Sequence, residues 1–234
     1  MILVALIVLL AALVQGVMGF GGALIAMPLL AALLGIKIAV PAFAIIGLVA
    51  TFFNSVRLRR HVTAGDLIQL GLPALLGIPL GVWLLARVDE ALVTRALGVV
   101  LLAYAVYGLS GLALPPLRHR AWAFVFGFTS GILTGAYNTG GPPVVVYGVA
   151  REWSADRFRA NLQTFFLLSS LFVVALHGLA GHLTLPVWQY ALVSLPALLV
   201  GQLIGARLCR YLDAALFKKI VLLFLALVGV SLLI

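Results

Sequence analysis

Apolar residues along this chain form long continuous runs instead of short alternating segments. Six runs are close to or longer than the roughly 20 residues that a helix needs to cross a bilayer. They cover Ile38–Val56, Leu67–Ala86, Leu92–Leu114, Phe158–Leu176, Pro186–Ala206 and Ala214–Ile234. The pattern therefore predicts six transmembrane helices.

Two further apolar stretches, Met1–Gly35 and Ala121–Ala150, are too long for one span and short for two. Glycine and proline interrupt each stretch near its middle, at residues 16–22 and 135–143. Backbone broken inside a bilayer is tolerated only where it faces protein or a solvated cavity, and such breaks tend to surround a substrate. We predict two broken-helix hairpins, a pattern typical of transporters.

The composition places the whole chain in a membrane. Of its 234 residues, 65% are hydrophobic and 9% charged, and the mean hydropathy is +1.25. This predicts an all-α polytopic membrane protein whose surroundings are the lipid bilayer. A net charge of +9 would suggest nucleic acid in a soluble protein, but here the basic residues lie in short loops, so we expect no nucleic-acid partner.

The basic residues also predict an orientation. If both hairpins return to the side on which they start, 12 of the 15 basic residues share one side of the membrane. The positive-inside rule then assigns that side to the cytoplasm. Both termini are expected outside the cytoplasm.

The two halves of the chain resemble each other. Leu72-Pro-Ala-Leu-Leu recurs at residues 195–199, Gly77-x-x-x-Gly81 recurs at 201–205, and Asp89 matches Asp213. We predict repeats at residues 1–114 and 121–234, joined by a cytoplasmic linker at 115–120. Each repeat is a hairpin plus three transmembrane helices, and this odd number of crossings makes the repeats inverted. The spaced glycines predict close helix packing, either between repeats or between subunits of a homodimer.

Candidate binding residues cluster at the two helix breaks. An apolar helix begins again after Gly21-Gly22 and after Gly140-Gly141, and the positive end of a helix dipole favours an anion. Pro142 and Pro143 suit a first helical turn. The nearby polar side chains able to contact oxyanions are Gln15, Tyr137, Asn138 and Thr139. The alternative is that the glycines only permit tight hairpin packing.

Other polar residues leave their roles open. Asn161, Gln163 and Thr164 begin a predicted span, where helix packing explains them as well as substrate contact does. His177 lies near the outward end of that span, as an interfacial or a titrating group. Protease, hydrolase and nucleotide-binding motifs are missing, and Cys209 is the single cysteine. We therefore expect no enzyme activity, metal or cofactor.

The two glycine motifs, GVMGFGGALIAMPLL and GAYNTGGPPVVVYG, together with the four-plus-four arrangement of apolar stretches, resemble the TauE/SafE sulfite exporter family. The resemblance covers nearly the whole chain. It implies export of a small sulfur-containing anion, such as sulfite, sulfoacetate or a related organosulfonate, across the bacterial inner membrane. The family's glycine-rich motifs fall on Gly19, Gly21, Gly22, Gly140, Gly141, Pro142 and Pro143.

These observations favour alternating access around a midplane site at the two breaks. An anion channel that uses the same hairpins as a filter is the main alternative. An accessory subunit of a sulfur-metabolising enzyme is disfavoured, because the loops are too short to offer a sizeable soluble interface.

Overall fold

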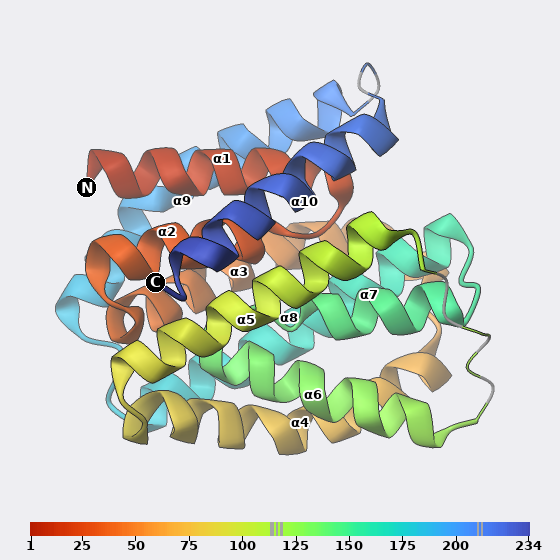
Figure 1. The fold of residues 1–234 in the computed structure, drawn as a ribbon, viewed down its shortest axis with the longest axis horizontal. Helices are drawn as coiled ribbons and strands as arrows, with labels where there is room; N and C mark the ends of the chain where they lie inside the picture. The colour runs from red at the N-terminus through yellow and green to blue at the C-terminus, as the bar shows by residue number, and fades with distance from the viewer. Residues whose placement is uncertain (113–114, 116, 118, 210, 212) are drawn as a thin grey trace. The chain divides into compact units, whose positions relative to one another are not determined.

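The computed structural model describes residues 1–112, 115, 117, 119–209, 211 and 213–234. These residues form ten α-helices and one 3₁₀ turn, and they include no strand. The first five helices are α1 (Ile2–Met18), α2 (Gly22–Leu34), α3 (Ile36–Leu58), α4 (Ala64–Arg87) and α5 (Glu90–Ser110), with the turn η1 (Arg59–His61) before α4. The other five are α6 (Ala121–Tyr137), α7 (Gly141–Ala150), α8 (Ala155–Leu179), α9 (Leu185–Leu208) and α10 (Ala214–Ser231), all drawn in Figure 1.

The all-α prediction is confirmed. Each predicted span contains a helix, and five helices are long and apolar enough to cross a membrane: α3, α4, α5, α8 and α9. The predicted span Ala214–Ile234 forms α10, which is not among these five. Helix α5 ends at Ser110, because Gly111 adopts a left-handed conformation at φ 67°. Residues 113 and 114, the last two of the predicted span Leu92–Leu114, lie outside the described residues. Residues 116 and 118 of the predicted linker, and Arg210, lie outside the described residues.

The helices group into two compact units, and each unit draws on both halves of the sequence. Unit 1 contains Met1–Phe43, Val88–Leu112 and the described residues of 185–234, and so holds α1, α2, α5, α9 and α10. Unit 2 contains Ala44–Arg87 and the described residues of 113–184, and so holds α4, α6, α7 and α8. The division falls within α3. The predicted repeat boundaries at 1–114 and 121–234 remain a prediction about the sequence.

In unit 2, the most extensive contact joins α4 to α6, which lie side by side in Figure 1. It depends on glycine in both helices. A Cβ added to Gly77 would overlap the carbonyl oxygen of Phe128, and one added to Gly131 would overlap that of Ala74. Small residues of this kind let two backbones approach closely where lipid supplies no hydrophobic drive for association.

In unit 1, α1 and α9 make the corresponding contact. A Cβ on Gly201 would lie 2.5 Å from the carbonyl oxygen of Leu9 and 3.1 Å from the amide of Leu13. Gly77 meets the carbonyl oxygen of Phe128 and the amide of Ile132 in the same way. The spaced glycines therefore do pack helices, within each unit and across the two sequence halves.

Helix capping repeats as well. The Asp89 carboxylate accepts hydrogen bonds from the amides of Ala91 (2.9 Å) and Leu92 (3.3 Å) at the start of α5. Asp213 caps α10 with the same spacing, at 2.8 and 3.3 Å. A side-chain oxygen at this position satisfies amides that precede the helical ladder. Aspartates at matching positions of the two sequence halves thus cap a helix in the same way, which supports the predicted repeat.

Candidate functional site

The first helix break occupies residues 19–21 in unit 1. Gly19 ends α1 in a left-handed conformation (φ 79°), and its amide donates to the carbonyl oxygen of Gln15 over 2.7 Å. Gly21 is left-handed too (φ 92°) and precedes the first residue of α2. Two left-handed positions so close together strongly favour glycine at both, because a Cβ strains this conformation. The break is therefore built into the motif.

The N-terminus of α2 offers backbone donors beside open space. Its first hydrogen bond joins the Ile25 amide to the Gly21 carbonyl oxygen, at 3.3 Å, so the amides of residues 22–24 precede the ladder. No atom lies within 4 Å of a Cβ built on Gly21. Gly22, in contrast, is buried, and a Cβ there would lie 2.5 Å from Oε1 of Gln15. Gln15 thus lies directly over the start of α2.

The second break occupies residues 138–140 in unit 2. Asn138 takes the left-handed conformation (φ 54°), and its amide donates to the carbonyl oxygen of Thr134 over 2.9 Å. The Ser130 hydroxyl donates to the carbonyl oxygen of Gly140 over 2.6 Å. A Cβ on Gly140 would overlap Oγ1 of Thr134. Gly140 is therefore held tightly against α6, and any larger residue would push the break away from it.

The two helix starts differ chemically. Pro142 and Pro143 carry no amide hydrogen, so Gly141 supplies the only backbone donor in the first three residues of α7, where α2 supplies three. A side-chain donor stands beside this start: Thr139 is 1% exposed, and its hydroxyl oxygen has no hydrogen-bond partner among the described residues. A buried hydroxyl without a partner costs about 1–3 kcal/mol, which a bound anion would offset.

The structure brings the predicted site residues together as two separate sets. Gln15, Gly19, Gly21 and Gly22 surround the first break, and residues 137–143 form the second. Within the second set, Tyr137, Gly140 and Pro142 are buried, whereas Asn138, Gly141 and Pro143 are partly exposed. Sequence reasoning missed the Ser130 hydroxyl, which holds the Gly140 carbonyl oxygen of the break from α6. That the two breaks meet around one ligand stays a prediction.

Comparison with known protein families matches residues 4–232 to the sulfite exporter TauE/SafE family. The chain belongs to the TauE/SafE sulfite exporter family. The match covers nearly the whole chain, so it includes both helix breaks and both units. No curated protein and no solved structure shows significant similarity to the chain.

Membership of the TauE/SafE family, together with the five long apolar helices, makes the chain a multi-pass membrane protein of a transporter family. Export of sulfite or another sulfur-containing anion across a membrane is the activity that the family implies. Transport agrees with the expectation of no enzyme activity. A small anion and the lipid bilayer are the partners that fit this assignment.

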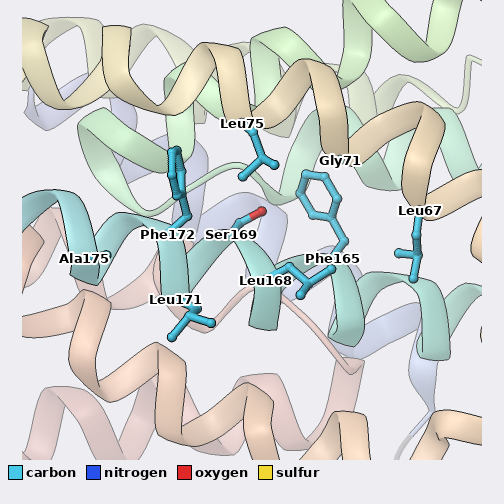
Figure 2. A pocket seen from close by; sticks show the side chains of 9 residues that line it. All are labelled: Leu67, Gly71, Leu75, Phe165, Leu168, Ser169, Leu171, Phe172 and Ala175. Carbon is cyan, nitrogen blue, oxygen red and sulfur yellow. The ribbon is translucent and has the colours of Figure 1, made fainter.

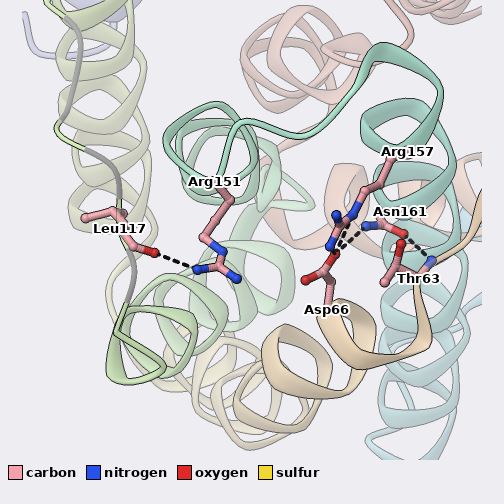
Figure 3. Close-up of polar contacts among 6 residues, drawn as sticks. All are labelled: Thr63, Asp66, Leu117, Arg151, Arg157 and Asn161. Carbon is pink, nitrogen blue, oxygen red and sulfur yellow. Dashed lines mark hydrogen bonds and ion pairs between the residues drawn. The ribbon is translucent and has the colours of Figure 1, made fainter.

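A buried polar network lies at the start of α4 and α8 in this TauE/SafE protein, within unit 2 (Figure 3). The Arg157 guanidinium donates to Oδ2 of Asp66 from Nε (2.9 Å) and Nη2 (2.5 Å). Asn161 joins them, since its Nδ2 donates to the same oxygen over 3.1 Å and its Oδ1 accepts from the Thr63 amide over 2.9 Å. These two hydrogen bonds tie Asn161 on α8 to the start of α4, so the structure gives this side chain a role in helix packing. Gln163 is also buried, and Thr164 is partly exposed.

Removing Arg157 should destabilise the protein more than removing Asp66. Arg157→Leu leaves a buried carboxylate without its cation and should cost about 2–4 kcal/mol. Asp66→Leu costs less, because the Arg157 side chain is 39% exposed and its guanidinium can reach water. Thermal unfolding of the two variants in detergent checks the order. Equal melting temperatures would contradict it.

Two histidines form a pair at the other end of α8. Nδ1 of His177 lies 3.0 Å from Nδ1 of His182, so one ring donates and the other accepts. His177 is 0% exposed, and its Nε2 has no hydrogen-bond partner among the described residues. His182 is partly exposed. The buried member of the pair thus depends on the other histidine.

Replacing His182 by alanine should lower stability by about 1–3 kcal/mol, because both ring nitrogens of His177 then lack partners. The double variant His177→Phe/His182→Ala should recover most of this loss, since it removes the buried polar atoms. A double-mutant cycle measured by thermal unfolding provides the check. Additive effects of the two substitutions would show that the pair contributes no stability.

Proposed function

We propose that this chain exports a small sulfur-containing anion, namely sulfite, sulfoacetate or a related organosulfonate, across the bacterial inner membrane. The observation that carries the proposal is the pair of helix breaks within a member of the TauE/SafE family. Each break is followed by a helix whose dipole favours a negative charge. Both termini lie outside the cytoplasm in this proposal.

Binding uses a different donor set at each break. At the first, the amides of residues 22–24 and the Gln15 side chain replace water around the anion. At the second, the Gly141 amide, the Thr139 hydroxyl and Asn138 do so. The open space at Gly21 supports this division, and so does the Thr139 hydroxyl, which has no hydrogen-bond partner in the part of the chain that the structure describes. Donors fixed by the fold replace hydration at little reorganisation cost, which gives selectivity for small oxyanions.

Transport proceeds by alternating access around these breaks. The duplicated contacts α1–α9 and α4–α6 support a pair of inverted repeats, which is the architecture that commonly rocks around a midplane site. Export of an anion from a negative interior is favourable by about 2.3 kcal/mol per charge per 100 mV. A uniporter therefore needs no buried carboxylate for a proton relay.

The test is efflux of labelled sulfite and sulfoacetate from vesicles that contain the purified protein, with pH clamped and a potential imposed. We expect saturable efflux that accelerates with an inside-negative potential and shows counterflow. Flux that does not saturate and lacks counterflow would favour the anion channel. If the protein produces no flux of any sulfur anion tested, the proposal is overturned.

A further inference from the structure

An apolar groove runs between α4 and α8 within unit 2 (Figure 2). Its volume is about 290 Å³. Leucine and phenylalanine side chains such as Leu75 and Phe165 form most of its lining, and Ser169 is the only polar residue there. Both helices are long and apolar enough to cross a membrane, so the groove lies along two spans.

The groove is open at its rim and unfilled at Gly71. Leu168 and Leu171 on its edge are 51% and 56% exposed. A Cβ built on Gly71 has no atom within 4 Å, in contrast to the glycines of the same helix that pack on α6. Exposed apolar side chains on a helix of spanning length suit contact with lipid hydrocarbon, and a hollow among them leaves room for a flexible unbranched chain.

One end of the groove is polar and basic. Asp66 precedes the groove residue Leu67, and Asn161 lies one turn before Phe165, so the Arg157–Asp66 network adjoins this end. Helix α6 runs parallel to α4. Gly127 contacts Leu70, and further toward the C-terminus of both helices Gly135 contacts Ile78. The starts of α4, α6 and α8 are therefore at the same end.

Exposed charges at that end favour an anion. Arg60, Arg120 and Arg159 are exposed there, against exposed Glu152 and Asp156. Juxtamembrane basic residues attract anionic headgroups. An apolar groove whose end carries more exposed basic than acidic residues suits a molecule with a long chain and a negative head.

We propose that this groove binds an acyl chain of an anionic glycerophospholipid, with the phosphate beside Arg157 and its basic neighbours. A second copy of this chain fits less well. Two copies with the same orientation in a membrane would bring the same basic ends together, and like charges repel. The groove shares no lining residue with the two helix breaks, so lipid binding and anion export are measured separately.

The experiment measures bound lipid by native mass spectrometry after exposure to bicelles of phosphatidylglycerol and phosphatidylethanolamine in equal amounts. Wild-type protein should retain one phosphatidylglycerol in preference to phosphatidylethanolamine. Gly71→Leu places a side chain in the groove and should lower occupancy about tenfold, as expected for displacing roughly two buried methylene groups. Gly65→Leu is the matched control, because Gly65 is exposed on the same helix with equally open surroundings.

Three results would overturn the proposal. Equal lipid occupancy in wild type and Gly71→Leu would place the lipid elsewhere. Equal retention of the two lipids would exclude the anionic headgroup. A wild-type dimer that Gly71→Leu dissociates would assign the groove to a second copy of the chain. The wild-type preference for phosphatidylglycerol needs no variant, so the headgroup test stands even if Gly71→Leu does not fold.

Discussion

Replacing Gly81 by leucine should prevent the chain from accumulating as folded protein, while the same change at Gly71 should be tolerated. Both glycines lie on α4. A Cβ on Gly81 would overlap the carbonyl oxygen of Ile132 and lie 2.8 Å from the amide of Ala136, whereas a Cβ on Gly71 meets nothing. Backbone atoms of a packed helix cannot move aside, so we expect a cost of at least about 3 kcal/mol at Gly81.

Fluorescence-detected size exclusion of the two variants in mild detergent measures this difference, with thermal unfolding for whatever folds. Gly205→Leu on α9 extends the test, because Gly205 meets the carbonyl oxygen of Leu13 and Cα of Gly16 in unit 1. If the halves are repeats, Gly205→Leu should fail as Gly81→Leu does. A monodisperse, stable Gly81→Leu protein would show that α4 and α6 are not packed as described.

The apolar runs predicted the helices well, because hydrocarbon leaves a chain little choice except a helix. They could not predict the partners of those helices. The glycine spacing on α4 and α9 identifies a close-packing face, but a face is compatible with many partners. The structure pairs α4 with α6 and α9 with α1, which lie in opposite halves of the sequence. Spacing within one helix contains no information about that exchange.

The amino-acid sequence was enough to predict where the candidate site lies, but it predicted only some of the groups that could contact a ligand there. The glycine and proline motifs locate both breaks, since few other residues adopt the conformations seen at Gly19 and Gly21. They do not reveal that Gly140 is fixed by Ser130, or that the prolines of α7 leave one amide where α2 has three. Such differences arise from contacts across a turn, which sequence spacing alone does not determine.

The Arg157–Asp66 pair shows the same limit over a longer distance. Each residue lies in the first turns of a helix, so sequence reasoning assigns both to span boundaries. The two positions are 91 residues apart, and only the packing of α4 on α8 brings them together. A single sequence gives the positions of charged residues along the chain but not their pairing in space.

Replacing Thr139 by valine should separate stability from anion binding. Valine keeps the shape of threonine and removes the hydroxyl, which is buried without a partner among the described residues. Without anion, the variant should therefore be as stable as wild type or more stable. A hydrogen bond to a charged group contributes about 1.5–3 kcal/mol, so sulfite affinity should fall roughly 10- to 100-fold.

Thermal shifts with increasing sulfite measure both effects in one protein, since a ligand that binds the folded state raises the melting temperature according to its concentration and affinity. Thr134→Val is the matched control on α6. Its hydroxyl already donates to the carbonyl oxygen of Ser130 over 2.7 Å, so its removal should lower stability and leave sulfite affinity unchanged. Unchanged sulfite binding in Thr139→Val would remove this hydroxyl from the anion site and leave the second break with the Gly141 amide and Asn138 alone. A loss of stability without anion would instead show that the Thr139 hydroxyl supports the fold.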